Sequence, residues 1–415
     1  MMLPELVYGV SDKKLGFAGY LVIDSMVGNK SCGGVRMSST VTLKEVRSLA
    51  RNMTLKYGFL GIPVGGAKAG IQINRTLSRN EKKLILAKFG KSLSRLIKAG
   101  YFIPGTDMGT SEEDIAWLLN AAKGRKNSYV NIYLSHIYAY TYTSWTMLHS
   151  AKQALNTLKE NSAFTHQRVS LGLDNTSVAI EGFGKIGSAA ARTFSENGAK
   201  IVAISTSNGA IYNPKGLDMD RLIAMKKIFG DDLVNKYDEA QRIAKDRLFQ
   251  LPVDILLPCA GSWTINSTNA HKVRAKIICP GANIPLTDKA EQILFKRGII
   301  CVPDFVSNSG AVLGSYLSRF INSEKKKKEI INKEFGQRVY TLLRISRERN
   351  IYPKGVAVEM AFRRFYAIKK GEGKLPSLFL RTVGFLVPSA YLRIFGNFLA
   401  PYMYTRLTAR AQNLW

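Results

Sequence analysis

The amino-acid sequence predicts an α/β protein of two domains, the second of which is a doubly wound, mostly parallel sheet. At 415 residues the chain is longer than a single hydrophobic core usually supports. The segment 178–204 holds an apolar run, a glycine turn, a helical stretch and a second apolar run, the order of a βαβ unit. Later apolar runs alternate with helical stretches, as in a parallel sheet covered by helices on both faces. We therefore expect a first domain at 1–145, completed by helices within 330–369, a second domain at 146–329, and a basic, apolar extension at 370–415.

A glycine turn reading GFGKIG follows the first apolar run of this unit. Gly182 permits the tight turn, Gly184 lets the backbone approach a pyrophosphate, and Gly187 lets the helix pack closely on the sheet. The helix expected over Ser188–Asn197 begins with free N–H groups that favour an anion. A purely structural glycine turn is the alternative. The pattern predicts a dinucleotide site lined by Gly182, Phe183, Gly184, Lys185, Ile186 and Gly187.

The end of the second strand bears on the choice of cofactor. Ile201–Ile204 is followed by Ser205-Thr206-Ser207 and not by the Asp or Glu that usually holds the adenosine ribose. Small hydroxyl side chains leave room for a 2′-phosphate. The expected cofactor is therefore NAD or NADP, with NADP slightly favoured, and the candidate cations are Lys185 and Lys215.

The composition is that of an ordinary globular protein except for its charge. Lys and Arg number 60 against 30 Asp and Glu, which gives a formal net charge of +30. Such a field attracts anionic cofactors and substrates, and could also support weak contact with nucleic acid or an anionic membrane. The basic residues are spread along the whole chain, so solvated basic surfaces are the commoner explanation.

The sequence favours a reducing, cytoplasmic setting. The N-terminus lacks the pattern of a signal peptide, and no uncharged apolar run reaches the roughly 18 residues of a membrane span. No metal site is expected from the four histidines. Neither zinc-ligand spacing nor a disulfide framework is visible among the four widely separated cysteines, Cys32, Cys259, Cys279 and Cys301.

The first domain contains a strand candidate, a glycine pair and two helical stretches. The strand is expected at Tyr20–Ile23, and Gly33-Gly34 follows it. A helix is expected over Thr42–Tyr57, with Lys56 near its end, and an amphipathic helix over Leu77–Leu96.

Two polar side chains of this domain are distinguished by their surroundings. Lys68 lies within GGAKAGI, where small neighbours give it no cover, so it is expected to line a cleft and to transfer protons. An exposed loop lysine is the alternative. Asp107 lies in a Gly/Pro turn after a strand, ahead of the helix caps Thr110 or Ser111, and is either a turn residue or an active-site acid.

The second domain continues with a charged stretch, 221–248, that is expected to be helical. The small, polar segment 305–316 lies at the end of a strand, where open α/β sheets bind ligands. Helices at 330–349 and 357–368 are expected to return to the first domain. Further buried strands are expected at Val253–Pro258, Lys276–Cys279 and Ile299–Val302.

Several motifs in a fixed order resemble those of the glutamate/leucine/phenylalanine/valine dehydrogenases. The first domain contributes GGVRM, MTLK, GGAKAGI and PGTDMGTSEEDIAWL, all ahead of the GFGKIG turn. The second contributes NGAIYNPKGLD, DILLPCA, AKIICPGAN and PDFVSNSGAV. The resemblance covers residues 17–369 and implies NAD(P)-dependent oxidative deamination of an L-amino acid, together with a homo-oligomer such as a hexamer.

The resemblance also implies roles for individual residues. Lys56 and the backbone of Gly33 and Gly34 hold the substrate α-carboxylate. Lys68 activates water and polarises the imine or carbonyl, while Asp107 moves the proton to and from the substrate nitrogen. The other matched positions are Val312 and Ser315 for the substrate, and Thr143, Thr206, Ala260, Asn283 and Asn308 for the cofactor.

One position leaves the choice of substrate open. Ser315 matches a serine that contacts the side-chain carboxylate in glutamate dehydrogenases, the members that this chain resembles most. The lysine that precedes the glycine pair in those enzymes is Cys32 here, unless Lys30 supplies the charge. Three hypotheses follow: a glutamate dehydrogenase, which is favoured; a dehydrogenase of branched-chain or other apolar amino acids; or a degenerate member that binds nucleic acid or membrane. The extension at 370–415 is expected to dock on the protein or a neighbouring subunit; lying on an anionic membrane and forming a disordered tail are the alternatives.

Overall fold

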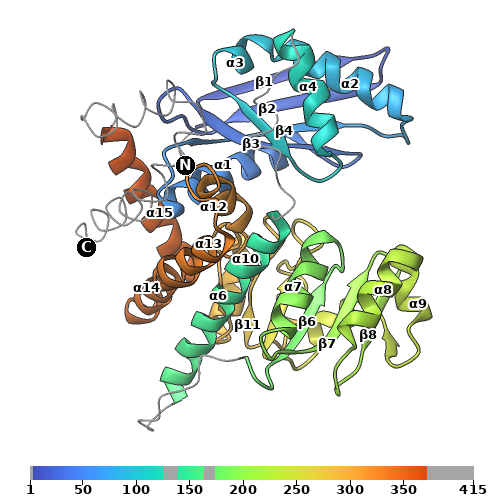
Figure 1. Cartoon of the computed structure of the whole chain (residues 1–415). Coiled ribbons are helices and arrows are strands. Elements are labelled where there is room, and N and C mark those ends of the chain that lie inside the picture. Colours follow the sequence, from blue (N-terminus) through green and yellow to red (C-terminus); the bar gives the residue numbers. More distant parts are fainter. Residues whose placement is uncertain (1–2, 125–138, 163–172, 372–415) are drawn as a thin grey trace. The chain divides into compact units, whose positions relative to one another are not determined.

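The computed structural model describes residues 3–124, 139–162 and 173–371 (Figure 1). These residues form two compact units. All but the first two residues of the extension at 370–415 lie outside the described residues, so its docking stays a prediction. The first unit comprises 3–124, 318–322 and 360–371, and the second comprises 139–162, 173–317 and 323–359.

The first unit is built on a mixed sheet of five strands. Their order is β1 (Leu6–Asp12), β2 (Phe17–Ile23), β4 (Gly65–Gln72), β3 (Ser31–Ser38) and β5 (Ile103–Thr106). Antiparallel pairs join β1 to β2 and β2 to β4, whereas β3 is parallel to both of its neighbours, β4 and β5. The predicted strand at 20–23 is the second half of β2. Strand β1 was not predicted, and its side chains alternate between half-buried and exposed.

Helices cover both faces of this sheet. Phe89 and Leu118, from α2 and α4, pack on one face against Ile71 of β4. Val46 of α1 packs on the opposite face against Val22 of β2. The helices are α1 (Leu43–Leu60), α2 (Arg79–Ser92), α3 (Ser94–Lys98) and α4 (Glu112–Lys123).

Capping side chains determine where two of these helices begin. Ser78 and Glu81 form a capping box at the start of α2, and Ser111 and Asp114 form one at the start of α4. Asp107 therefore takes no part in the cap of α4.

The second unit is built on a sheet of seven strands, most of them parallel. Their order is β12 (Ile300–Cys301), β11 (Ile277–Ile278), β10 (Ile255–Pro258), β6 (Ser177–Glu181), β7 (Lys200–Thr206), β8 (Gly209–Tyr212) and β9 (Gln241–Ile243). Neighbours from β12 to β7 are parallel, and β8 and β9 add an antiparallel edge. The structure confirms the strands that the sequence predicts for the parallel part of the sheet, and with them the doubly wound fold.

In the second unit, α6 contacts α7, α11, α12 and α14. Short 3₁₀ turns occur at 230–232, 245–250 and 270–272. The other helical elements are α6 (Ala139–Ser162), α7 (Lys185–Ser195), α8 (Met219–Phe229), α9 (Leu233–Lys236), α10 (Asp288–Lys296), α11 (Asp304–Ser307), α12 (Gly310–Leu317), α13 (Glu324–Ile330), a π-helical turn (Ile331–Phe335) and α14 (Gly336–Glu348). Helix α15 (Pro353–Lys370) begins in this unit and continues in the first.

The structure differs from two of the helical predictions. The segment 221–248 contains α8, α9 and also β9, because residues 241–243 find hydrogen-bonding partners in β8. Helix α14 does not return to the first unit but packs against α6, and of the predicted return helices it is α15 that joins the first unit, from residue 360 onward. Among the described helices, none is long and apolar enough to cross a bilayer.

Candidate active site

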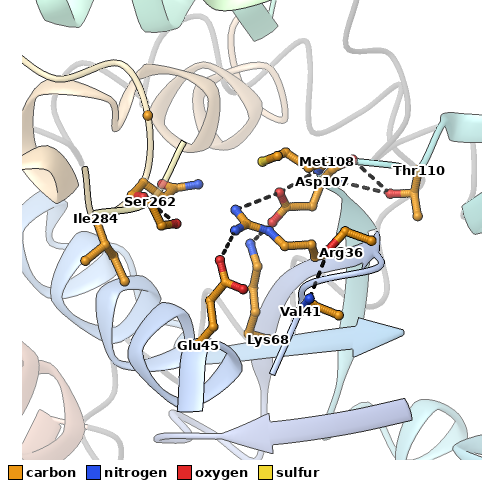
Figure 2. Close-up of polar contacts among 12 residues, drawn as sticks. Arg36, Val41, Glu45, Lys68, Asp107, Met108, Thr110, Ser262 and Ile284 are labelled. Atoms are coloured by element: carbon orange, nitrogen blue, oxygen red, sulfur yellow. Dashed lines mark hydrogen bonds and ion pairs between the residues drawn. The ribbon is translucent and has the colours of Figure 1, made fainter. Parts of the chain in front are cut away.

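Strands β3, β4 and β5 bring the two predicted catalytic residues together. Lys68 points to the α1 side of β4, since its neighbours Ala67 and Ala69 pack into the core on the other face. Asp107 directly follows β5. The ammonium group of Lys68 pairs with Oδ2 of Asp107, as Figure 2 shows. Their side chains are only 4% and 7% exposed, so solvent screens this ion pair weakly.

Arg36 on β3, which the sequence analysis did not single out, extends this ion pair into a row of alternating charges. Its guanidinium group lies 2.5 Å from Oε1 of Glu45 and 3.4 Å from Oδ1 of Asp107. The N–H of Met108 donates to the same Oδ1 at 2.6 Å. Desolvation alone would raise the pKa of Asp107, but the charges of Lys68 and Arg36 lower this pKa to about 2. Asp107 is therefore a carboxylate at neutral pH.

The glycine pair on β3 is required by close packing at this site. A Cβ atom on Gly33 would lie 1.7 Å from the carbonyl oxygen of Ala67 on β4. A Cβ atom on Gly34 would lie 2.7 Å from the carbonyl oxygen of Thr106 and 2.9 Å from Cβ of Asp107. Because glycine lacks this atom, the turn that carries Asp107 can lie directly against β3.

Lys56 and Cys32, two other residues considered in the sequence analysis, lie in the same unit. Lys56 belongs to α1 and is 5% exposed. Cys32 lies on β3. Desolvation raises the pKa of the Cys32 thiol, while a hydrogen bond with Tyr57 and the charges of Arg319 and Lys68 act in the opposite direction. Arg319 and Lys68 thus both interact electrostatically with this thiol.

In the second unit, the predicted glycine turn joins β6 to α7. Gly182 has a φ of +90°, and a Cβ atom there would lie 2.8 Å from Ala260, while one on Gly187 would lie 1.9 Å from the carbonyl oxygen of Gly182. Gly184 is the N-cap of α7 and provides no side-chain cap, so N–H groups at the helix start are available to an anion. Lys185 is the first residue of the helix, and its ammonium group lies 5.5 Å from the ring centroid of Tyr140.

Hydrogen bonds connect the glycine turn to the end of β7, and the end of β6 to the residues that follow β10. The N–H of Phe183 donates to the carbonyl oxygen of Ser205 at 2.6 Å, and the N–H of Gly182 donates to Oγ of Ser205 at 3.0 Å. Glu181, at the end of β6, accepts a hydrogen bond of 3.4 Å from the N–H of Ala260. Desolvation raises the pKa of Glu181 to about 7. The sequence analysis did not select Glu181, because it stands at the end of an apolar strand and no local pattern distinguishes it.

The predicted residues Asn283 and Asn308 are in contact. The side-chain amide of Asn308 donates to the carbonyl oxygen of Ala282 at 2.8 Å and to Oδ1 of Asn283 at 3.0 Å. Within the described part of the chain, Oδ1 of Asn308 and Oγ of the adjacent Ser309 are buried without a hydrogen-bond partner. Buried polar atoms are costly to leave unsatisfied, so these two suit a polar ligand at the carboxyl ends of the strands.

Helix α6, which carries Thr143, packs closely against α12, which carries the predicted substrate residues Val312 and Ser315. A Cβ atom on Gly310 would lie 1.9 Å from the carbonyl oxygen of Tyr142. The hydroxyl of Tyr142 also donates to Glu324 at 2.6 Å and accepts from Lys327 at 2.9 Å. Helices α6, α12 and α13 are thereby fixed to one another.

The two lysines proposed as cations for a 2′-phosphate lie at different ends of the sheet. Lys185 is at the glycine turn. Lys215, by contrast, lines an open pocket of about 460 Å³ together with Lys200, the first residue of β7. The neighbouring Leu217 donates to the carbonyl oxygen of Ile201, near the same end of that strand. The prediction for Lys215 is therefore wrong, because the glycine turn adjoins the opposite, carboxyl end of β7.

The tight glycines, the uncapped start of α7 and the unsatisfied oxygens of Asn308 and Ser309 fit a dinucleotide. These features, and the buried lysine–carboxylate pair of the first unit, are those expected of an NAD(P)-dependent dehydrogenase. Residues 6–123 match the model of the Glu/Leu/Phe/Val dehydrogenase dimerisation domain, and residues 138–373 match the model of Glutamate/Leucine/Phenylalanine/Valine dehydrogenase. The chain belongs to this family of amino-acid dehydrogenases.

Similar proteins agree with this assignment. A glutamate dehydrogenase of Thermotoga maritima is 32% identical over 85% of this chain and 86% of its own length. An NADP-specific glutamate dehydrogenase of Saccharolobus shibatae is 32% identical over 72% of each chain, and an NAD-specific one of Staphylococcus aureus is 30% identical over 84% of each. The hetero-hexameric glutamate dehydrogenase of Thermus thermophilus, solved in a Leu-bound form, shares the fold with a TM-score of 0.71, at 24% identity over 90% of this chain and 91% of that one.

Proposed function

We propose that this amino-acid dehydrogenase acts on glutamate, producing 2-oxoglutarate and ammonia in a reversible oxidative deamination. The observation that carries the catalytic part of the proposal is the buried Lys68–Asp107 pair beside the glycine pair of β3. The similarity to glutamate dehydrogenases over most of the chain supports the substrate. The alternative of a protein that only binds nucleic acid or membrane gains no support from the family match.

The roles proposed for the residues follow from their charges. Lys56 and the N–H groups of Gly33 and Gly34 hold the α-carboxylate of the substrate. Asp107, kept ionised by its cationic neighbours, accepts a proton from the substrate α-ammonium group, which leaves the amine that can be oxidised. When bound, the oxidised nicotinamide supplies the acceptor for the hydride of the substrate Cα. Lys68 then assists the attack of water on the imine carbon and stabilises the developing charge on oxygen.

Arg319 is proposed to compensate for the missing lysine at Cys32. Lys30 is exposed, whereas the charge of Arg319 reaches the thiol of Cys32 together with that of Lys68. The segment 318–322 packs within the first unit, the unit that also contains Cys32 and Lys68. A substrate whose reacting carbon lies at Lys68 would thus find a second cation for its side-chain carboxylate. The uncharged Cys32 itself favours the second candidate, a dehydrogenase of apolar amino acids.

A substrate screen tests the two candidates. Initial rates with glutamate, leucine, valine and phenylalanine, each with NAD and NADP, should give the highest kcat/KM for glutamate. Arg319→Ala should then lower kcat/KM for glutamate by about tenfold or more, the value of one hydrogen bond to a charged group, and leave leucine unaffected. Arg344→Ala, which removes an exposed arginine of α14, is the matched control. Preference for an apolar substrate, with no effect of Arg319→Ala, would favour the second candidate; Cys32→Lys should in that case create glutamate activity.

A homo-oligomer is also proposed, since residues 6–123 match the model of a dimerisation domain. Light scattering of the purified chain measures its mass directly, and a monomer would contradict the proposal.

A further inference from the structure

A strained residue ends the loop 281–284, which follows β11 and carries Asn283. Ile284 has a φ of +52°, in the left-handed region, and it is followed by Pro285. A β-branched residue rarely adopts this conformation, and a residue before proline favours an extended backbone. Strained backbone of this kind persists only where surrounding contacts hold it, and it clusters at ligand sites. The contacts that hold Ile284 therefore determine where the 281–284 loop lies.

Two hydrogen bonds hold the backbone of Ile284. Its N–H donates to Oδ2 of Asp304 at 2.7 Å, and its carbonyl oxygen accepts from the N–H of Trp263 at 2.8 Å. Asp304 is only 4% exposed, so water does not readily replace it as the acceptor. A hydrogen bond to a charged group and the strain of one left-handed residue are of comparable size. Asp304 is therefore a strong enough acceptor to keep Ile284 in this conformation.

Lys354, near the start of α15, supplies positive charge for the buried carboxylate of Asp304. Desolvation lowers the pKa of Lys354, but the charges of Glu291 and Asp304 raise this pKa above its ordinary value. The ammonium group also lies 2.8 Å from Oδ1 of Asp288 and 3.4 Å from Oε2 of Glu291, both on α10. Because a buried charge without a partner is costly, Lys354 and Asp304 stabilise each other's ionised form.

Helix α11 holds the 281–284 loop at a second point. The side-chain amide of Asn308, at the end of this short helix, donates to the carbonyl oxygen of Ala282 and to Oδ1 of Asn283. The N–H of Asn308 in turn donates to the carbonyl oxygen of Asp304 at 2.9 Å. One helical turn thus fixes the loop from both of its ends, through Asp304 and through Asn308.

The 281–284 loop lies on the nicotinamide side of the expected dinucleotide. A dinucleotide whose pyrophosphate lies on the glycine turn after β6 places its adenosine at the end of β7. In the sheet order, β11 and β7 lie on opposite sides of β6, so the residues after β11 face the other half of the dinucleotide. The buried, unsatisfied Oδ1 of Asn308 belongs to the same group of residues.

We propose that Asp304 is a positioning residue for the dinucleotide. Through its hydrogen bond to Ile284 it sets Asn283 against Asn308 on the nicotinamide side, and Lys354 is its counter-cation. The inference rests on the proposed use of a dinucleotide and adds two residues, Asp304 and Lys354, that the sequence analysis did not single out. Asp304 acts through the backbone of the 281–284 loop.

Calorimetric binding of two probes to the intact protein tests the inference without catalysis. The tighter of NADH and NADPH is compared with the matching ADP-ribose, 2′-phosphorylated in the case of NADPH, which lacks the nicotinamide. Asp304→Ala should weaken the reduced dinucleotide by roughly tenfold, the loss of one hydrogen bond to a charged group, and leave the ADP-ribose unchanged. Ile284→Gly alone should change either affinity by less than about twofold, because glycine adopts a positive φ without strain. In the Ile284→Gly protein, Asp304→Ala should cost only about threefold or less, since no strained residue remains to be held.

Further variants separate the hydrogen bond from the stability of the fold. Asp304→Asn keeps an oxygen that can accept from Ile284, so its affinity for the reduced dinucleotide should stay within about threefold of wild type although its stability falls. If Asp304→Ala does not fold, Asp304→Ala combined with Lys354→Met also removes the unpaired cation and should show the same loss of roughly tenfold. Asp220→Ala, which removes an exposed acid from the first turn of α8, is the matched control and should change neither affinity.

The outcomes distinguish this inference from the proposed function. Wild-type affinity in Asp304→Ala would overturn the inference, and so would an equal loss for both probes, which indicates a general effect on the fold. An equal loss with and without Ile284→Gly would show that Asp304 does not act through Ile284, and would overturn it as well. In all three cases the dinucleotide site itself stands. If the wild-type protein binds neither probe, the glycine turn holds no dinucleotide, and the proposed function fails together with the inference.

Discussion

Replacing Asp107 by Asn removes one charge from the buried row Glu45–Arg36–Asp107–Lys68 and keeps the shape of the side chain. The fall of the pKa of Asp107 from 3.8 to about 2 corresponds to roughly 2 kcal/mol of net favourable interaction with its surroundings. Asn forfeits this contribution and leaves the ammonium group of Lys68 buried without its partner carboxylate. We therefore expect the free energy of unfolding to fall by about 2 to 4 kcal/mol.

The pH dependence of this loss has a definite sign. A depressed carboxyl pKa stabilises the native state above the unfolded pKa of 3.8, and the contribution disappears as the pH falls toward 2. The difference between wild type and Asp107→Asn should thus be constant from neutral pH down to about pH 5, and should shrink only in strong acid. Turnover should fall by about 10²- to 10⁴-fold, because a positioned proton carrier is lost.

Urea unfolding and the absorbance of reduced nicotinamide measure the two effects. Glu113→Gln, which breaks the exposed pair with Arg79 in the same unit, is the control and should change both little. An Asp107→Asn variant that unfolds at the wild-type urea concentration and turns over at the wild-type rate would refute the reasoning for this ion pair.

Two further predictions concern stereochemistry and pH. Gly34→Ala should lower activity by about a hundredfold, because its Cβ atom displaces the turn of Asp107, whereas Gly105→Ala, with no atom within 4 Å of its Cβ, should keep activity. Equal activities of the two alanine variants would contradict this packing argument. Glu181→Gln should stabilise the protein increasingly between pH 4.5 and about 7, by up to roughly 3 kcal/mol, since the wild-type acid resists ionisation only in the folded state. Urea unfolding at pH 5 and pH 8 measures the gain, and a gain of the same size at both would count against burial as its cause.

The parts of the fold that local sequence determines could be predicted, and those that depend on distant partners could not. The glycine spacing at residues 182–187, between an apolar run and a helical stretch, is sufficient to predict β6, the turn and α7, although the close contact of Gly182 is with the distant Ala260. Strand β9 lies in a stretch whose composition is helical, and it forms through hydrogen bonds to β8 about 30 residues earlier in the chain.

The same distinction applies to the candidate sites. Lys68 and Asp107 could be selected because small or turn-forming neighbours surround them in the sequence. No local pattern shows that Arg36 bridges Asp107 and Glu45, since those contacts arise from the order of the strands. Lys215 follows β7 within a few residues in the sequence, but the chain passes to the other end of that strand before reaching it.

The glycines of α12 have a mechanical consequence. Gly310 and Gly314 let Tyr142 lie directly against that helix, and Tyr142 immediately precedes Thr143 on α6. A displacement of α12 must therefore carry α6 with it. The helix that bears the predicted nicotinamide contact and the helix that bears the predicted substrate contacts would therefore move as one rigid unit. The relative position of the two ligands would then be set by the backbone packing of these helices and not by adjustable side chains.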